Sequence, residues 1–222
     1  MKKNKAAILV HLKLNSQRLK GKNLKLLNGV PLYEHTFKKL KKNKSFFDVY
    51  IHSSSEKIEK ISNSYGFEFL KRQKKLDLPN AQGNELIMDC IDKIENEILI
   101  QLFVTNPFIK IKTLKNMVRE LKTNKNVNSI TPITNIYNRF WHKGTEINHK
   151  YNKLVGTQFM TPVSVETGVY CFRKKAFNSE KSRICKKNKL LEVDEIQSFD
   201  IDTKLDFFLA ENLAKKLRIK FD

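Results

Sequence analysis

With 222 residues, 40% of them hydrophobic, the chain is long enough to bury the core of one domain, and we treat residues 1–222 as a single domain. A formal net charge of +20 would ordinarily indicate a nucleic-acid partner, but the lysines are spread along the whole chain as in a compositional bias, so we do not expect nucleic acid as a partner. Three widely spaced cysteines exclude a disulfide framework and a zinc pattern, and no segment is long enough to span a membrane, so we expect a cytoplasmic protein.

The first predicted element is a buried strand, an apolar run at 6–10 that leads into a basic loop at 13–23. The backbone amides and cationic side chains of such a loop can surround a polyphosphate. Lys13, Arg18 and Lys22 are the candidate phosphate ligands. The alternative is a solvated surface loop, and that is the interpretation we favour for Lys20.

Strands and helices alternate after this loop. Pro31 is placed to begin a helix, and a strand at 46–52 leads to a second helix that begins at the capping-box pair Ser53 and Glu56 and stops at Gly66. A short strand at 67–70, an irregular stretch at 72–83, a helix at 84–94, an apolar strand at 98–104, a helix at 113–122 and a strand at 129–133 follow. This alternation predicts a three-layer, doubly wound α/β fold with a mostly parallel sheet.

The alternation ends at 134–165, which we interpret as an excursion of loops or a β-ribbon from the sheet. Its aromatic cluster, Tyr137, Phe140 and Trp141, predicts packing in a subunit interface, with stacking on nucleic acid as the alternative. The chain returns to the sheet at 166–172 and closes with a helix whose apolar stripe is Leu205, Phe208, Leu209, Leu213 and Leu217. No two of the five histidines are spaced as a metal-ligand pair, and His52, at a strand end, is interpreted as structural.

Two carboxylates precede that last helix. Asp200 and Asp202 lie two residues apart, so on an extended strand end they point the same way. Two carboxylates together with the oxygens of a triphosphate make a suitable Mg²⁺ site. The alternative is that Asp202 or Thr203 caps the final helix, with Asp206 in its first turn.

Two motifs near the ends of the chain carry a family resemblance. The first is Ala-x-x-Leu-x-x-x-Lys-x-Asn-Ser-x-x-Leu-x-x-Lys-Asn-Leu-x-x-Leu-Asn-Gly, from Ala6 to Gly29, and the second is Asp-Ile-Asp-Thr-x-x-Asp, from Asp200 to Asp206. Both resemble motifs of the CMP-sialic acid synthetases, or acylneuraminate cytidylyltransferases. The similarity continues more weakly through most of the chain between them.

The resemblance implies a nucleotide-diphospho-sugar transferase-like fold, in which the excursion at 134–165 forms a homodimer contact and closes over the partner subunit's site. Lys13 takes the place of a family Arg, Lys22 matches a Lys that contacts the triphosphate, Asn23 matches an Asn near the cytosine, and Arg72 matches an Arg of an Arg-Pro motif. Lys13, Lys22 and Asp202 are thus the predicted catalytic residues, with Mg²⁺ on Asp200 and Asp202 as cofactor. The predicted nucleotide-binding residues are Leu12, Lys13, Asn15, Ser16, Arg18, Lys22, Asn23 and Arg72.

The predicted acceptor-binding residues are Thr105, Asn106, Glu166 and Thr167, although Glu166 could instead cap its strand against a nearby Lys. Here the chain departs from the family. The family's Leu-Gln-Pro-Thr-Ser-Pro-Leu-Arg is represented by 102–109 without its Gln and Arg, and its Asn-Gly-Ala by 167–169. In the basic loop a Lys replaces an Arg, and Lys cannot reproduce the bidentate fork of Arg. These departures leave the acceptor open.

The resemblance therefore predicts a Mg²⁺-dependent cytidylyltransferase that transfers CMP from CTP to an acidic sugar of the nonulosonic acid type, releasing pyrophosphate and making a CMP-sugar for surface glycan synthesis. One alternative keeps this chemistry with a phosphate or phosphonate acceptor. The other is a non-catalytic basic α/β protein that binds nucleic acid or a protein partner.

Overall fold

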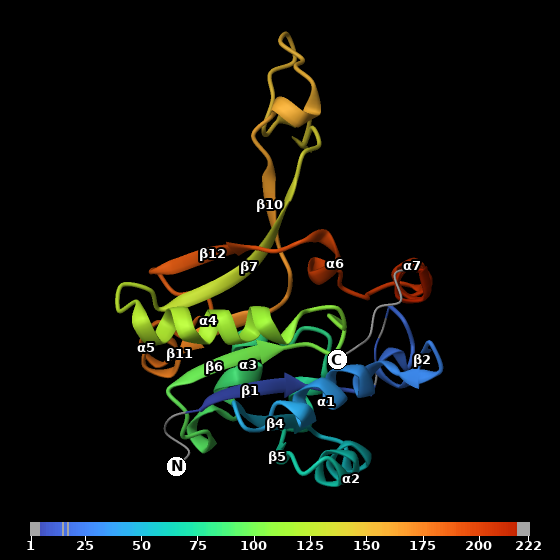
Figure 1. The fold of residues 1–222 in the computed structure, drawn as a ribbon, viewed down its shortest axis with the longest axis vertical. Helices are drawn as coiled ribbons and strands as arrows, with labels where there is room; N and C mark the ends of the chain where they lie inside the picture. The colour runs from blue at the N-terminus through green and yellow to red at the C-terminus, as the bar shows by residue number, and fades with distance from the viewer. Residues whose placement is uncertain (1–4, 15, 17, 217–222) are drawn as a thin grey trace.

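A computed structural model describes residues 5–14, 16 and 18–216, and among them eight strands form one sheet in the order β10-β7-β11-β6-β1-β4-β5, with β12 on β7 (Figure 1). β1, β4, β5 and β6 are parallel, and β12 is parallel to β7, whereas β10 and β11 run antiparallel to their neighbours. The strands are β1 (Ala6–His11), β4 (Phe47–Ser53), β5 (Glu68–Lys71), β6 (Ile98–Leu102), β7 (Ser129–Ile136), β10 (Val163–Glu166), β11 (Tyr170–Arg173) and β12 (Asn188–Glu192).

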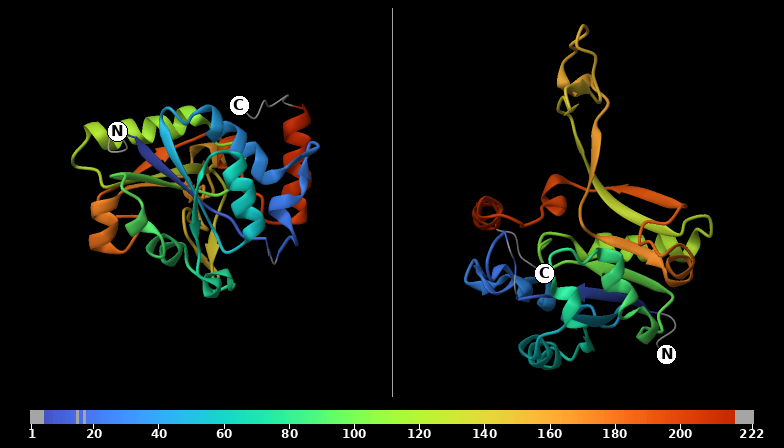
Figure 2. Two further views of the ribbon diagram at one scale, coloured as in Figure 1. Left: turned by 90° about the horizontal axis from the view of Figure 1, so that it is seen from below. Right: turned by 180° about the vertical axis from the view of Figure 1, so that it is seen from behind.

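The central strand β1 shows why the sheet is covered on both faces. All six of its residues are buried, and its side chains alternate between two separate core clusters. Ile8 and Val10 pack beneath α1 (Leu32–Lys42), α2 (Glu56–Ser64) and α4 (Ile111–Thr123). Ala7 and Leu9 pack against α3 (Gly83–Met88), η4 (Ile91–Lys93) and α5 (Lys174–Glu180), on the opposite face (Figure 2). The predicted three-layer α/β fold is confirmed.

Two details of the predicted helices were wrong. The helix expected at 84–94 is interrupted between Met88 and Ile91. The Asp89 carboxylate at this interruption is hydrogen-bonded to His52 and Gln73. The capping box expected at Ser53 and Glu56 does not form, because Ser55 is the N-cap of α2. Gly66, with φ of +67°, does end that helix as expected.

The region between 173 and 198 contains three elements that were not predicted. They are α5, β12 and α6 (Glu195–Ser198), whose N-cap Asp194 accepts a hydrogen bond from Gln197 N at 2.9 Å. β12 is mostly exposed and pairs with the outer edge of β7, so its apolar pattern is weak. An edge strand of this kind gives little sequence signal.

The predicted excursion is an arm. β7 and β10 pair through 133–136 and 163–166, and the chain between them projects away from the body, carrying the short hairpin β8 (Trp141–His142) and β9 (Thr145–Glu146) and the turn η5 (Thr157–Phe159) (Figure 1). After β10 the chain follows the same edge of β7 into β11, with a break at Thr167 and Gly168. Gly168 has φ of +74°, a left-handed conformation that favours glycine.

The last helix, α7 (Lys204–Lys216), joins the two ends of the chain. It packs with β2 (Leu26–Leu27) and α1 in a third core cluster that includes Leu27, Leu32, Ile201, Ala210 and Ala214. The antiparallel pair of β2 and β3 (Val30–Pro31) and the turn η2 (Lys22–Leu24) belong to the same region, and η3 (Lys74–Asp77) lies in the stretch expected to be irregular. The predicted apolar stripe of this helix was wrong in part: Leu213 packs against the cluster, but Leu205, Phe208 and Leu209 are exposed, because α7 turns Ala210 and Ala214 toward the core. Leu217 of that stripe lies outside the described residues. No helix in the described part of the chain combines the length and the apolar composition needed to cross a bilayer.

Candidate active site

A cleft of about 300 Å³ opens at the carboxyl ends of β1, β5 and β6, the usual position of ligand sites in open α/β sheets. Residues from five separate parts of the chain converge on it. The lining residues are His11, Lys13, Ser16, Arg18, Lys22, Asn23, Arg72, Leu76, Ala81, Leu86, Phe103, Val104, Thr105, Gly168, Asp200 and Asp202.

One wall of the cleft is a contact between the two predicted motifs. Lys22, on η2, is buried, and its Nζ donates to Ile201 O at 2.6 Å and to Asp202 Oδ1 at 2.9 Å. Arg18 is largely exposed and bonds the other oxygen of Asp202 at 2.8 Å. Residues 180 positions apart are therefore fixed together by charge, with the remaining cationic surface facing the cleft.

Asp200 lies beside this ion pair on the same wall. Its carboxylate is reached by solvent from the cleft, but the surrounding protein raises its pKa by desolvation, and the neighbouring Asp202 carboxylate raises the pKa further. A hydrogen bond from the Thr105 hydroxyl and the nearby charge of Lys22 oppose that rise in pKa. The two carboxylates thus repel each other at a place where an added cation would be stabilised.

The capping alternative for this segment is confirmed for Thr203 and Asp206 and wrong for the side chain of Asp202. The Thr203 hydroxyl accepts from Asp206 N at 3.2 Å, and the Asp206 carboxylate accepts from the backbone nitrogens of Asp202 and Thr203 at 3.0 and 2.7 Å. These contacts form a reciprocal cap at the start of α7. The side chain of Asp202 therefore takes no part in the cap and is available to Lys22 and Arg18.

The basic loop turns at Gly21, which has φ of +66°, and this turn returns Asn23 to the start of the loop. Asn23 is buried, its Nδ2 donates to Lys13 O at 2.7 Å, and its Oδ1 has no partner among the described residues. Lys13 and Ser16 line the cleft beside it. The structure thus brings together most of the predicted nucleotide-binding loop; Asn15 lies outside the described residues.

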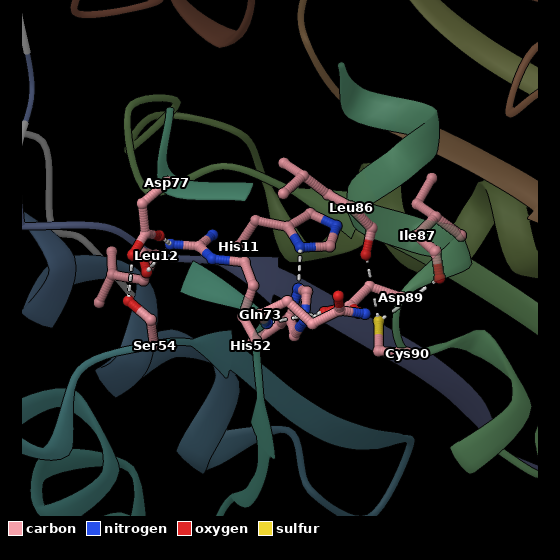
Figure 3. Close-up of polar contacts among 11 residues, drawn as sticks. His11, Leu12, His52, Ser54, Gln73, Asp77, Leu86, Ile87, Asp89 and Cys90 are labelled. Atoms are coloured by element: carbon pink, nitrogen blue, oxygen red, sulfur yellow. Dashed lines mark hydrogen bonds and ion pairs between the residues drawn. The ribbon is translucent and has the colours of Figure 1, made fainter. Parts of the chain in front are cut away.

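Arg72 forms a buried support at the cleft wall. Its guanidinium donates to Leu12 O at 3.2 Å and to Asp77 Oδ1 at 2.5 Å, and Ser54 Oγ donates to the other oxygen of Asp77 (Figure 3). Arg72 lines the cleft as predicted. Leu12 does not, because its side chain is in the core and its backbone nitrogen and oxygen are bonded to His52 O and Arg72.

The predicted acceptor-binding residues lie in different environments, and of them Thr105 reaches the cleft. Thr105 lines the cleft, whereas Asn106 is fully buried directly behind Gly168, so that a Cβ on that glycine would lie 3.3 Å from Asn106 Oδ1. Thr167 is buried with its hydroxyl unpaired among the described residues, and Glu166 is exposed and bonded to Tyr170. Asn106, Glu166 and Thr167 do not contribute to the lining of the cleft.

Sequence reasoning missed a pair of buried histidines. His11 Nδ1 and His52 Nδ1 lie 2.9 Å apart, and His52 Nε2 lies 3.0 Å from Asp89 Oδ2 (Figure 3). His11 lines the cleft, while His52 is fully buried behind it. Their spacing of 41 residues hides the pair, but both follow apolar runs that form neighbouring parallel strands, and His11 is the register partner of His52.

The apolar wall of the cleft was also missed. Leu76, Ala81 and Leu86 come from the stretch expected to be irregular and the helix after it, and Phe103 follows β6. Scattered apolar side chains in a loop carry no periodic signal, so the sequence alone does not distinguish them from core residues.

No group of three or more His, Cys, Asp and Glu side chains suited to a metal occurs within 5–14, 16 and 18–216. The three cysteines are free and buried, and burial raises the pKa of Cys90 to about 12, so that thiol is inert. Asp200 and Asp202 are the residues of the cleft with hard oxygen donors side by side. The cleft therefore combines cationic side chains with a pair of neighbouring carboxylates.

Comparisons with known proteins agree with this description. A family model described as cytidylyltransferase matches residues 7–153. Over 92% of the chain and 93% of its own length, the post-translational flagellin modification protein B of Campylobacter coli is 26% identical. A CMP-N,N'-diacetyllegionaminic acid synthase of Legionella pneumophila is 26% identical over 90% of the chain and 92% of its own length.

Among solved structures, a CMP:2-keto-3-deoxy-manno-octonic acid synthetase complexed with CTP superposes with a TM-score of 0.72 and 13% identity, covering 96% of this chain and 99% of that one. At this identity the likeness shows the fold alone. It confirms the fold predicted from the alternation of strands and helices.

Proposed function

This chain belongs to the cytidylyltransferase family, and on that premise we propose that it transfers CMP from CTP to an acidic sugar of the nonulosonic acid type and releases pyrophosphate. The full-length match to a CMP-N,N'-diacetyllegionaminic acid synthase supports an acceptor of this class. The observation that carries the proposal is the junction of Lys22, Arg18 and Asp202, which joins the two motifs into one charged wall.

In the proposed reaction the acceptor hydroxyl attacks the α-phosphorus of CTP, and the bond from that phosphorus to the bridging oxygen of the β-phosphate breaks. The hydroxyl loses its proton to water, and the leaving group departs as pyrophosphate. Lys13, Arg18 and Lys22 line the side of the cleft where this negative charge would develop. Fixed cations at that position stabilise the transition state more than the ground state.

Asp200 and Asp202 would hold Mg²⁺ in this site. Their fit to the ion rests on two adjacent carboxylates, with the pKa of Asp200 raised first by burial and further by the neighbouring Asp202 carboxylate. The metal would supply positive charge to the phosphate oxygens. The part of this chain is then to hold the Asp202 carboxylate in place through Lys22 and Arg18.

The arm supports a homodimer. Its large apolar side chains are unusually exposed for a single copy, with Phe159 at 78%, Tyr151 at 74%, Leu154 at 63% and Trp141 at 55%. An extended ribbon cannot bury these side chains against itself, so a second copy of the chain is the partner we propose for it. The arm of one copy would then lie on the body of the other.

The function is tested by pyrophosphate release from CTP with a panel of acceptors: nonulosonic acids, 3-deoxy-octulosonic acid, and phosphate or phosphonate compounds. We expect release with an acidic sugar and none with the phosphate acceptors. Release only with a phosphate or phosphonate acceptor would overturn the acceptor class while leaving the nucleotidyl transfer. No release with any member of the panel, from protein that binds CTP, would contradict the proposed catalysis.

A further inference from the structure

The buried pair of histidines forms a connected chain that ends at the cleft. The Asp89 carboxylate accepts hydrogen bonds from Gln73 N at 3.2 Å and from Gln73 Nε2 at 2.5 Å, and its Oδ2 also lies 3.0 Å from His52 Nε2 (Figure 3). His52 in turn meets His11 through the two Nδ1 atoms at 2.9 Å. His11 Nε2, at the far end, is buried and has no partner in the part of the chain that the structure describes.

These contacts determine where the protons are. The Asp89 carboxylate can only accept, so His52 Nε2 carries a proton and donates it. Burial lowers the pKa of His52 to about 4, so the ring is neutral and its Nδ1 carries no proton. Of two nitrogens in contact one must donate, so His11 Nδ1 carries a proton. Burial holds the pKa of His11 well below its usual range, so its ring is neutral too, and Nε2 is left as an acceptor.

The cleft has two chemically different ends. A second hollow, of about 270 Å³, shares Lys13, Ser16, Arg18, Lys22 and Asp202 with the main cleft, and it excludes His11 and the apolar wall. The charged residues thus mark the end for phosphates. The other end is formed by His11, Arg72 and the apolar residues Leu76, Ala81, Leu86 and Phe103, with the rings of His11 and Phe103 6.3 Å apart.

Apolar walls with few fixed acceptors, His11 Nε2 among them, suit a planar base better than they suit a sugar with many hydroxyls. We propose that His11 Nε2 accepts a hydrogen bond from the exocyclic 4-amino group of cytosine, and that His52 and Asp89 are positioning residues that keep this nitrogen unprotonated. The inference rests on the proposed function, since it takes CTP as the nucleotide. His11 is then the residue that distinguishes CTP from UTP.

The discrimination follows from the two bases. Cytosine presents a donor at position 4, whereas uracil presents a carbonyl oxygen there, which would face the lone pair of Nε2. A site built to bond a donor rejects strongly an analogue that lacks it. Without the Asp89 chain, the imidazole could place its proton on either nitrogen and would accept both bases.

The test is the ratio of CTP to UTP affinity in His11→Gln, measured by calorimetry, together with the ratio of kcat/KM in pyrophosphate release. Glutamine offers an amide oxygen or an amide NH₂, so it can bond either base. We expect the CTP preference to fall by about tenfold or more, with the affinity for UTP rising or unchanged. His35→Gln is the matched control, because His35 is also buried but does not line the cleft. It should leave the ratio unchanged, whatever it does to stability.

A second measurement does not depend on a variant folding. In protein labelled with ¹⁵N at histidine, we expect His11 Nε2 to show the chemical shift of an unprotonated nitrogen, and CTP to move it further than UTP does. A protonated His11 Nε2, or an unchanged CTP preference in folded His11→Gln, would overturn the inference.

The outcomes also separate this inference from the proposed function. Selective CTP binding that depends on His11, without pyrophosphate release for any acceptor, would sustain the inference and overturn the function. Turnover with an unchanged ratio of CTP to UTP affinity in His11→Gln would sustain the function and overturn the inference. A wild-type protein that binds neither nucleotide would overturn both.

Discussion

Lys22 is the residue on which both halves of the charged wall depend, and we expect Lys22→Met to reduce turnover strongly. Methionine keeps the aliphatic stem of the lysine and removes only its charge and donors. In the structure that ammonium makes two contacts, with Ile201 O at 2.6 Å and Asp202 Oδ1 at 2.9 Å, and 9% of the side chain is exposed. The substitution therefore removes the connection between η2 and the segment before α7.

Two effects of different size follow from this loss. Asp202 is 28% exposed and keeps Arg18 as a partner, so the free energy of unfolding should fall by about 1.5–3 kcal/mol, the range for a hydrogen bond to a charged group. A preorganised charge at a developing oxyanion is worth about 2.7–4 kcal/mol in the transition state, so kcat should fall by roughly 10²–10³-fold. The catalytic effect should exceed the effect on stability.

The assay is pyrophosphate release under saturating CTP and acceptor, with urea denaturation of each variant. Lys20→Met is the matched control, because Lys20 belongs to the same loop but is exposed and absent from the cleft lining. We expect it to keep the wild-type rate. A Lys22→Met protein that is folded and within about threefold of the wild-type kcat would refute the role given to Lys22.

Four other outcomes are expected. Asp202→Asn should remove metal-dependent turnover and leave a folded protein, and a normal rate at ordinary Mg²⁺ concentration would contradict the metal site. Lys13→Arg should change the KM for CTP little; an inactive variant would mean that the loop is built around lysine. Light scattering should show a dimer that Trp141→Ala weakens, whereas a wild-type monomer at working concentration would contradict the arm's role. Burial lowers the pKa of Lys39 to about 8 in the folded protein, from its ordinary value of 10.5. Between these two values Lys39 is protonated in the unfolded chain and largely neutral in the folded one, so the unfolded state binds more protons. The unfolding free energy of wild type minus that of Lys39→Met should therefore rise over that window, and a flat difference would contradict the shift.

The layered fold could be predicted because its signals are local. Each buried strand is a short apolar run, and each covering helix shows a 3.6-residue stripe, so the alternation appears directly in the sequence. The prediction failed where burial is partial. β12 lies on the outer side of β7 and is mostly exposed. The helix expected at 84–94 is interrupted at Asp89, which bonds His52 on β4 and Gln73 after β5. Neither cause is visible in a window of ten residues.

The residues of the candidate site likewise differ in how well the sequence predicts them. Lys22, Arg18, Asn23 and Asp202 were predicted from motifs whose residues stand close together, and the structure brings them to one cleft. Glu166 and Thr167 were assigned from a weaker match, and they lie outside its lining. His11 and His52 meet only through the register of two parallel strands. Their pairing could have been inferred once β1 and β4 were taken as neighbours, since both residues occupy the same strand end.

The two ends of the cleft are supported by different parts of the fold, and this difference has a consequence for catalysis. The phosphate end depends on a contact between a loop and the segment before α7, two pieces held by Lys22 and Asp202. The base end depends on β1 and β4, whose residues are fixed in the centre of the sheet. Effects at the two ends should therefore be nearly additive, because they share no hydrogen-bond partner. The double variant His11→Gln with Lys22→Met should show the CTP preference of the first and the low kcat of the second. A strong deviation from additivity would mean that the base and the phosphates are sensed through one connected network instead.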